Sequence, residues 1–436
     1  MNVTTQVTLK RVCLAFMLSL FMLPALQAKF NWVKEGALGG YTGTQPATEP
    51  ALVLDSLTAN TYQPALERYL EDHIGFRTWL IRFRNQLQYS LLNVAKANDT
   101  VVGEDNLLLS IGGIKDYLGE GFVGDREVQH HVQRFKAVQD SLRHRGKLLV
   151  FVIAPAKTTF YAEAHPAYYR RQPRGRSNYM AYAAAMQQAG VNLLDLSRAF
   201  RVWKDTASYP LFPRGGFHWS GYGTERAVDT LVHYIEHRTQ LDLPDYAVTQ
   251  LDITDEPRNP DDDIAKAMNL LWPPTAFTMA YPLVQFKPLQ GHQKRPDVML
   301  YGDSFGYNLL YPYISELFSP ESTFWYYGQQ VAYGPTTKGD QTWQLNHREE
   351  YLKRDVIIIL YNEFNLRNFD GGFSKDLYRL LTPFTAADNA RIDSIAEKIR
   401  QAPGASDRLW AKASQRNMSQ QEVSREEAVE QYERLH

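Results

Sequence analysis

The sequence has almost no cysteine, no excess of charge of either sign and only one long apolar run. Its 436 residues include a single Cys, Cys13, which excludes a disulfide scaffold, a Cys-based zinc site and an iron–sulfur cluster. The 47 Lys and Arg balance the 48 Asp and Glu, which argues against a nucleic-acid binder that works through bulk positive charge. With 44% hydrophobic and 22% charged residues, the composition is that of a folded globular chain and excludes wholesale disorder.

The one long apolar run lies near the N-terminus. It covers residues 12–26 and follows a Lys-Arg pair, which is typical of a secretory signal, and it is shorter than the roughly 20 residues of a membrane span. Cleavage after Ala28 would leave Leu26 at the −3 position, so residues 1–28 are either a signal peptide or an uncleaved membrane anchor. Because Cys13 lies inside this segment, the rest of the chain is free of cysteine, as suits an oxidising compartment. We expect a periplasmic or cell-surface protein, soluble after cleavage or anchored at its N-terminus.

Helical extensions are expected at both ends of the chain. Residues 29–124 are predicted to form a tether and a helical region, because 33–62 are rich in Gly, Thr and Pro and apolar residues recur at helical spacing along 63–93. We interpret 63–93 as an amphipathic helix with a solvated Arg-bearing side, and a membrane-facing side is the alternative. Residues 386–436 are polar and charged and predict a C-terminal helical tail.

The central part of the chain, residues 125–385, predicts an α/β domain. Short, continuously apolar runs are typical of buried parallel strands, and helical patterns separate them, so we expect a parallel sheet with helices on both faces. A segment at about 240–296, rich in Pro, Asp and Trp, breaks this rhythm and is interpreted as an insertion. The predicted strands cover 147–153, 191–194, 298–301, 323–327 and 356–361, and the predicted helices cover 128–144, 179–189, 220–237 and 307–317.

Ser304 is the candidate nucleophile. It follows Gly302-Asp303 at the end of a predicted strand and precedes a predicted helix. The carboxyl end of a parallel strand is where α/β proteins bind ligands, and a helix that begins there would aim N–H groups at an oxyanion. A Gly-Asp-Ser tripeptide is a weak signal by itself, and its strand-turn-helix context is what strengthens it.

His218 is the candidate base that such a serine needs. It lies in the Gly-rich segment 212–223, just before a predicted helix that Ser220 is suited to cap. This setting is unlike that of most core histidines, although a structural histidine is the alternative interpretation.

Residues at two further strand ends fit the same chemistry. Gly328 and Asn362 follow successive predicted strands, where an N–H group and a side-chain amide would complete an oxyanion hole with the Ser304 N–H. The alternative is that both merely form turns. Trp219 and Tyr327 are candidates for stacking on sugar rings, with core packing as the alternative.

The remaining candidate patterns are better interpreted as surface or loop residues than as functional sites. His233 and His237, with Glu236, spell a zinc-protease pattern but lack a third ligand at a convincing spacing. The neighbouring His130 and His131 are interpreted as surface residues. Three consecutive aspartates, 261–263, suit a charged loop better than a calcium site. We expect no metal ion and no cofactor.

The blocks Gly302-Asp303-Ser304, Gly328 and Asn362 resemble the SGNH (GDS) esterase superfamily. In most of that superfamily the histidine follows the serine, whereas His218 precedes Ser304 here. This order resembles the alginate O-acetyltransferase SGNH-like family of the AlgX/AlgJ type, and the likeness spans most of residues 65–370. The resemblance implies an exported protein that moves acetyl groups on or off polysaccharide hydroxyls, with the acetyl donor supplied by a membrane-bound O-acyltransferase.

The sequence departs from this family at one important position. The family usually has Asp two residues before the histidine, and this sequence has Gly216 there. The acid that would orient the His218 ring is therefore unassigned. Asp195, after the strand 191–194, is the first candidate, and a Ser–His dyad without an acid is the alternative.

Three functions remain open from the sequence. The favoured one is serine-dependent O-acetyl transfer to a cell-surface polysaccharide, with Ser304 as nucleophile and His218 as base. A carbohydrate acetylesterase would use the same residues and differ only in its acceptor. The third is a non-catalytic polysaccharide-binding or scaffold protein on a decayed hydrolase fold, which the missing Asp would favour.

Overall fold

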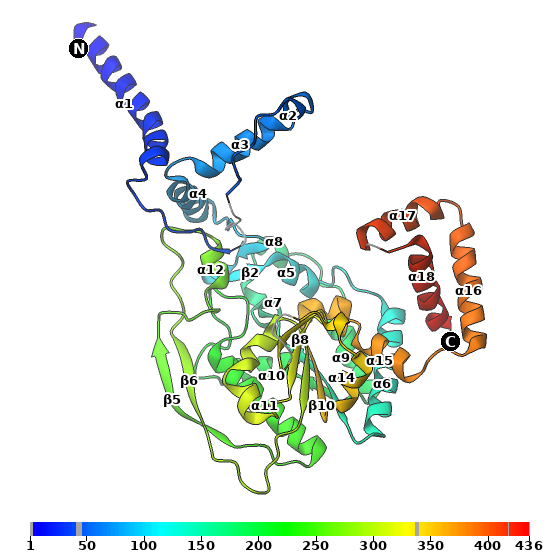
Figure 1. Ribbon diagram of the computed structural model, residues 1–436. Helices are drawn as coiled ribbons and strands as arrows, with labels where there is room; N and C mark the ends of the chain where they lie inside the picture. Colours follow the sequence, from blue (N-terminus) through cyan, green and yellow to red (C-terminus); the bar gives the residue numbers. More distant parts are fainter. Residues whose placement is uncertain (1–2, 41–45, 336–339, 417, 436) are drawn as a thin grey trace.

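The computed structural model describes residues 3–40, 46–335, 340–416 and 418–435 (Figure 1). Its centre is a six-stranded sheet of order β4-β3-β10-β7-β8-β9, in which every neighbouring pair is parallel except β8 and β9. The expected α/β fold with a largely parallel sheet is therefore confirmed. The strands are β3 (Leu148–Ala154), β4 (Leu193–Asp195), β7 (Val298–Gly302), β8 (Thr323–Tyr326), β9 (Gln330–Tyr333) and β10 (Val356–Asn362).

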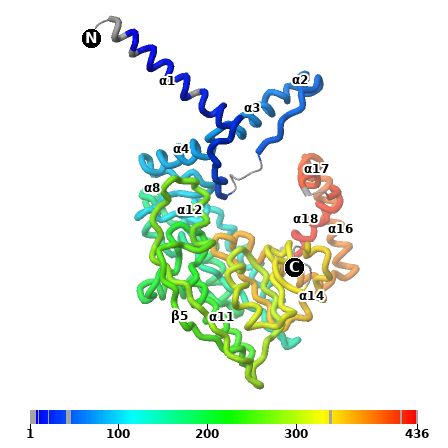
Figure 2. The backbone as a smooth tube through the Cα atoms, turned by 60° about the vertical axis from the view of Figure 1, so that its left-hand side comes forward, coloured from blue at the N-terminus to red at the C-terminus, as the bar shows by residue number. Residues whose placement is uncertain are grey.

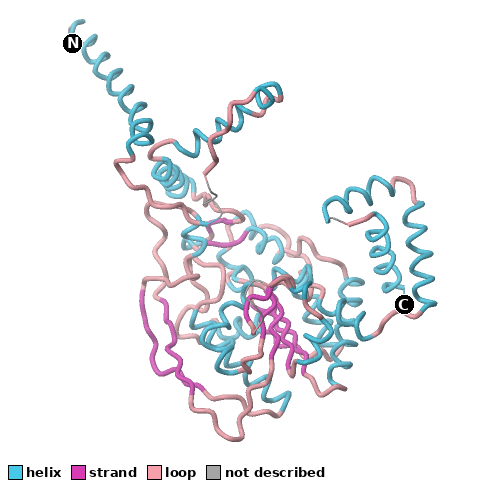
Figure 3. Tube along the Cα trace, viewed as in Figure 1, coloured by secondary structure: helices cyan, strands magenta, loops and turns pink. Residues whose placement is uncertain are grey.

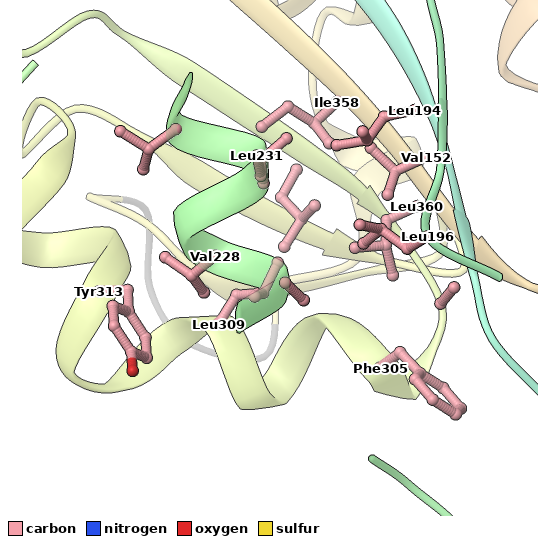
Figure 4. Close-up of a cluster of buried hydrophobic side chains, with 14 of the residues drawn as sticks. Val152, Leu194, Leu196, Val228, Leu231, Phe305, Leu309, Tyr313, Ile358 and Leu360 are labelled. Carbon is pink, nitrogen blue, oxygen red and sulfur yellow. The ribbon is translucent and has the colours of Figure 1, made fainter. Parts of the chain in front are cut away.

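Two cores cover the two faces of this sheet. Because side chains alternate along a strand, Val152 and Ile358 pack with α10 and α11 on one face (Figure 4), while Phe151 and Ile359 pack with helices on the other. Strands that are buried on both faces must be apolar at every position, which explains the continuous apolar runs. The first face is covered by α10 (Leu196–Trp203) and α11 (Gly221–Thr239), and the second by α6 (Asp125–Arg143), α9 (Asn178–Gln188), α14 (His347–Lys353) and α15 (Phe373–Leu381).

The segment after Ser304 differs from the expected α-helix over 307–317. Tyr311 has extended dihedral angles, φ −124° and ψ 129°, and Pro312 has no N–H to donate, so a continuous α-helical ladder cannot form. Three short pieces take its place: the 3-10 helix η4 (Ser304–Leu309), the π-helix η5 (Leu310–Ile314) and α13 (Ser315–Leu317).

The insertion has regular structure of its own. It contains an antiparallel ribbon (Figure 3) that is separate from the main sheet, with a short helix between its two strands. The sequence pattern did not predict these elements, since Pro and Asp obscure the alternation of apolar residues. They are β5 (Tyr246–Thr254), α12 (Asp263–Ala267) and β6 (Met279–Phe286).

The N-terminal region projects from one end of the molecule (Figures 1 and 2). The single helix expected over 63–93 is two helices, because Ile74 is extended and Phe76 is left-handed with φ 60°. A small hairpin and short helices join this region to the sheet. The elements are α1 (Val3–Phe30), α2 (Leu54–Thr58), α3 (Tyr62–His73), α4 (Arg77–Leu92), β1 (Thr100–Val102), η2 (Glu104–Asn106), β2 (Leu108–Ser110), α5 (Ile111–Tyr117), α7 (Lys157–Phe160), η3 (Ala162–Ala164) and α8 (Ala167–Arg170).

The C-terminal tail is helical, as the sequence predicts, and has small apolar clusters of its own. Ion pairs join it to the sheet domain: Glu433 lies 2.9 Å from Arg379 and Glu430 lies 2.6 Å from Lys375. The tail comprises α16 (Ala386–Gln401), α17 (Ala405–Arg416) and α18 (Gln420–Leu435), and the 3-10 helices η6 (Thr342–Gln344) and η7 (Glu363–Asn368) precede it in the chain.

Candidate active site

Ser304 and His218 meet at the carboxyl end of the sheet. Ser304 follows β7, and His218 lies in the loop before α11. The Ser304 Oγ is 2.8 Å from the His218 Nε2, which is hydrogen-bonding distance. Both residues are half-buried, so a ligand can reach the pair while most of the imidazole is shielded from water. The ring can therefore accept the hydroxyl proton, as a general base must.

Asp303 holds the turn that presents Ser304. Its Oδ1 accepts the Phe305 N–H at 3.0 Å, and its Oδ2 accepts the Asn362 N–H and the Asn365 side-chain amide, both at 2.7 Å. The carboxyl is fully buried, and this burial raises its pKa although three N–H donors lower it. Asp303 thus ties the nucleophile turn to the end of the neighbouring strand β10.

Asp263 lies on the other side of the His218 ring. Its Oδ2 is 3.5 Å from the His218 Nδ1, slightly longer than a hydrogen bond, and the contact becomes an ion pair only when the ring is protonated. Its Oδ1 accepts the Phe217 N–H at 2.9 Å and the Ile264 N–H at 2.7 Å. The carboxylate is therefore bound to the residue before His218 and faces the ring nitrogen that points away from Ser304, where an acid can orient the ring and stabilise its protonated form.

Gly216 is a glycine because the insertion packs directly against it. A Cβ at this position would lie 2.7–2.9 Å from backbone atoms of Asp261, closer than real contacts allow. The preceding residue, Gly215, is bound to the same segment, since the Ala265 N–H donates to the Gly215 carbonyl at 2.9 Å. The segment that excludes a side chain at position 216 is the segment that carries Asp263.

Asp195, the acid suggested by the sequence, lies elsewhere. Its Oδ1 accepts the Arg198 N–H at 2.8 Å and caps α10, and its Oδ2 accepts the Tyr179 hydroxyl at 2.9 Å. Both oxygens are committed to these bonds, so the structure brings Asp263 rather than Asp195 to His218. Sequence reasoning missed Asp263, because the insertion breaks the α/β pattern. The run of three aspartates, beside a missing family Asp at 216, was the available signal.

A buried lysine supports the His218 loop from α7. The Lys157 Nζ donates to the carbonyls of Arg214 and Gly216, both at 2.8 Å. Its burial lowers the pKa to about 7, against the nearby carboxylates of Asp263 and Asp261, which raise it. Burial also raises the pKa of Asp261 to about 6, while a hydrogen bond from Tyr281 at 2.8 Å opposes the shift. The aspartate run is thus partly interior, since Asp261 is buried while Asp262 and Asp263 are half-buried.

Gly328 and Asn362 do lie at strand ends next to Ser304. Gly302, two residues before the serine, pairs with Tyr326 of β8 and Leu360 of β10, and neighbouring strands are about 4.8 Å apart. Gly328 has φ +66°, a conformation that glycine adopts without strain. The Asn362 side chain is 1% exposed and donates to the Pro155 carbonyl at 2.7 Å, so one of its amide hydrogens is already used.

The two aromatic candidates have different surroundings. Trp219 is fully buried and packs against Phe200 and Phe305. Its indole is therefore part of the hydrophobic core and cannot stack on a sugar. Tyr327 is half-buried and its hydroxyl accepts the Asn365 amide at 3.3 Å. Trp343, which sequence reasoning passed over, is 73% exposed and follows Thr342, whose hydroxyl donates to the Gly328 carbonyl at 2.5 Å.

Two of the other histidines that the sequence singles out, His233 and His131, have partners of their own. His233 bonds to the carbonyl of Asp229 on its own helix at 2.8 Å, and the described residues contain no group of three or more potential metal ligands. His131 is not a surface residue as expected, since its Nδ1 bonds to the Tyr182 hydroxyl at 2.7 Å and its ring stacks on Phe369.

Comparisons with known proteins found similar sequences. Residues 117–317 match the family described as SGNH hydrolase-like domain, acetyltransferase AlgX. A probable alginate O-acetylase AlgJ of Pseudomonas aeruginosa is 29% identical over 160 residues, which cover 36% of this chain and 38% of that protein. The matched part is thus well under half of this chain and of the length of that relative.

Solved structures give similar neighbours. The O-acetyltransferase domain of Pseudomonas putida AlgJ aligns over 64% of this chain and 99% of that one, with 18% identity and a TM-score of 0.42. Pseudomonas aeruginosa AlgX aligns over 64% and 67%, with 15% identity and a TM-score of 0.42.

Proposed function

We propose that this protein transfers O-acetyl groups to an alginate-like cell-surface polysaccharide through a serine acyl-enzyme, because residues 117–317 match the SGNH hydrolase-like family of acetyltransferase AlgX. The observation that carries the proposal is the 2.8 Å contact between the Ser304 Oγ and the His218 Nε2. The carboxylate of Asp263 behind the ring supports it. A non-catalytic scaffold does not require a serine, a histidine and a carboxylate in contact with one another, so this arrangement favours catalysis.

The reaction has two halves with one proton carrier. The Ser304 Oγ attacks the acetyl carbonyl of the donor ester while His218 takes the hydroxyl proton. The tetrahedral intermediate collapses, and the donor alcohol leaves with that proton from His218. A sugar hydroxyl then gives its proton to His218 and attacks the acetyl-serine. His218 finally returns the proton to Ser304, and Asp263 stabilises the imidazolium in both halves.

We assign the oxyanion hole to the N–H groups of Ser304 and Gly328 and the second amide hydrogen of Asn362. Ser304 and Gly328 each follow the end of one of two adjacent strands, β7 and β8, which supports this assignment. Preorganised donors of this kind lower the barrier because they need no rearrangement as charge develops. Tyr327 and the exposed Trp343 are the proposed aromatic contacts for the sugar rings.

The acetyl donor is proposed to come from a membrane-bound O-acyltransferase, as the resemblance to the AlgX/AlgJ type implies. That partnership fits export to the periplasm or cell surface, with α1 as a signal or an anchor. The part of the chain that the structure describes has one helix long and apolar enough to cross a membrane, with its apolar segment at Lys10–Phe30.

An assay with and without a sugar acceptor distinguishes acetyl transfer from hydrolysis. Purified protein is incubated with an aryl acetate and mannuronate oligosaccharides, and products are followed by mass spectrometry. A transferase adds acetyl groups to the oligosaccharide, whereas an esterase releases acetate at the same rate with or without it. Glycan binding by calorimetry without any turnover would instead favour the scaffold function.

The catalytic pair is tested in the same assay. Ser304→Ala and His218→Ala should each remove most turnover, and the double variant should lose little more, because the two residues act as a unit. Ser315→Ala, at a half-buried serine on the same segment, is the matched control and should retain activity. Additive losses from the two single variants would contradict a shared mechanism.

A further inference from the structure

Helix α4 is oriented with its polar side towards the protein. Asn85 and Gln86 are its buried residues. The Asn85 amide donates to the Met268 carbonyl at 2.9 Å, and the Gln86 carbonyl oxygen accepts the Trp272 N–H at 2.9 Å. An ordinary surface helix of a globular protein buries its apolar side instead.

The opposite side of α4 is apolar and exposed. The residues on this side, called here the apolar stripe, recur at helical spacing and are 43–74% exposed, and they are Trp79, Leu80, Phe83, Leu87 and Leu91. Trp272, whose backbone is bonded to α4, is 71% exposed beside them. A contiguous exposed apolar surface of this kind marks an interaction site.

The stripe is joined to the apolar helix α1. The Gly75 N–H, just before α4, donates to the Pro24 carbonyl of α1 at 3.2 Å, and a Cβ at Gly75 would lie 2.3 Å from that oxygen. Glu35, just after α1, accepts the Phe76 and Thr78 N–H groups at 2.5 and 2.8 Å. The start of α4 is therefore fixed to the last turns of α1, and both project from the same end of the molecule (Figures 1 and 2).

Depth and charge both fit a membrane surface. Pro24 lies six residues before the end of α1 at Phe30, which is about 9 Å along a helix. Interfacial helices bury their apolar faces about 5–10 Å into a bilayer. Helix α4 contains no acidic residue. Of its three arginines, Arg77 pairs with Asp72 at 2.8 Å, and Arg82 and Arg84 are those that can reach anionic headgroups while their stems remain in apolar surroundings.

We propose that the apolar stripe of α4 docks on an anionic lipid bilayer, in which it lies flat at the surface that α1 crosses or enters. The proposal rests on membrane attachment through α1 and does not depend on acetyl transfer. It commits to lipid as the occupant, since the stripe continues an apolar helix and the charged residues of α4 are all arginines. Docking would hold the sheet domain, and so Ser304, at a fixed height above the membrane.

The test labels single cysteines in the full chain. In a Cys13→Ser background, Phe83→Cys or Leu87→Cys carries an environment-sensitive fluorophore, and Val202→Cys, at a site 68% exposed on α10, is the matched control. The protein is reconstituted in vesicles of phosphatidylcholine, alone or with an equal part of phosphatidylglycerol. Flotation with the vesicles checks attachment through α1 independently of the labels.

The label at positions 83 and 87 should shift to the blue, be quenched by spin-labelled lipid and be protected from aqueous iodide, more strongly with phosphatidylglycerol. The label at position 202 should show no blue shift and no quenching by spin-labelled lipid, and it should remain accessible to iodide. Iodide access at 83 and 87 equal to that at 202, in protein that floats, would overturn the proposal. Protection from iodide without quenching by lipid would also overturn it, because a second copy of the chain would then cover the stripe.

Discussion

Gly216 and Asp263 depend on one another at the scale of single residues. The family position for the orienting acid is Gly216, where the backbone of Asp261 leaves no room for a side chain. Asp263, two residues after Asp261 on that same segment, supplies the carboxylate instead, and its Oδ1 accepts the Phe217 N–H. We propose that the insertion supplies the carboxylate that the His218 loop lacks, so that the site needs neither Asp195 nor an acid-free dyad.

Removing this carboxylate tests the assignment. Asp263→Asn should lower kcat by about 10²–10⁴, because a neutral amide cannot stabilise the imidazolium. KM should change much less. Asp262→Asn, at the neighbouring position, and Asp195→Asn are the controls and should retain most of the activity. Steady-state kinetics with an aryl acetate measures all three, and a large loss in Asp195→Asn with full activity in Asp263→Asn would refute the assignment.

Restoring the family residue should be harmful here. Gly216→Asp places a Cβ within 2.9 Å of three backbone atoms of Asp261, so either the loop or the insertion must move. We expect a lower melting temperature and a lower kcat, since the same movement displaces Asp263 from His218. Thermal unfolding followed by circular dichroism and the ester assay measure the two effects. A gain in kcat would show that the loop has room for its own acid.

At the scale of elements, the His218 loop is held between α7 and α12. Lys157 of α7 donates to two carbonyls of the loop from one side, and Asp263 and Ala265 of α12 bind its backbone from the other. A Gly-rich loop has little structure of its own. These bonds from two short helices are therefore what positions the imidazole.

The lysine makes this support dependent on pH. Burial lowers the Lys157 pKa to about 7 from its usual 10.5, so between these values the unfolded chain binds a proton that the folded chain does not, and stability rises with pH. The free energy of unfolding of the wild type, minus that of Lys157→Met, should therefore increase from pH 7 to pH 9, by at most about 1.4 kcal/mol per pH unit.

Urea unfolding of both proteins at several pH values measures this difference. At every pH, Lys157→Met should be the less stable protein, because two buried carbonyls lose their donor at a cost of about 1–3 kcal/mol each. Lys147→Met is a suitable control, since Lys147 also donates to a backbone carbonyl, that of Arg354, but lies away from the loop. A difference that is flat with pH would mean that Lys157 does not titrate as its burial suggests.

At the scale of the whole molecule, the N-terminal region and the active site share one segment. Asn85 of α4 binds the Met268 carbonyl, and the Gly39 N–H donates to the Asn269 side chain at 2.7 Å. Both contacts fall just after α12, which carries Asp263. The N-terminal region therefore contacts the segment that follows Asp263, and we propose that this contact links membrane attachment to the position of His218.

The location of the protein is tested with its own N-terminus. Residues 1–35 fused to a reporter that is active only outside the cytoplasm should give an active reporter, because a basic pair precedes an apolar helix. Fractionation of the fusion then separates a cleaved signal from an anchor. A fusion without Lys10 to Leu26 is the control, and an inactive, cytoplasmic full fusion would contradict export.

The sequence by itself determined five of the six strands of the sheet and three of the helices that cover it, α6, α9 and α11. Continuous apolar runs such as 356–361 have one stable environment, a strand buried on both faces, so the α/β fold followed from local pattern. Ser304 and His218 could also be named, because a serine at a strand end and a histidine in a glycine-rich loop are unusual local settings.

Only the tertiary structure decided which groups complete the site and which way the helices face. Asp263 comes from an insertion far from His218 in the chain, and no local pattern records which loop folds back on Gly216. The sequence does not tell which tryptophans are buried: Trp219 is buried in the core, whereas Trp343 is exposed. The spacing that predicted an amphipathic helix over 63–93 did not reveal that α4 turns its polar side inwards. Burial and partnership are properties of packing, and packing brings together residues that the sequence keeps apart.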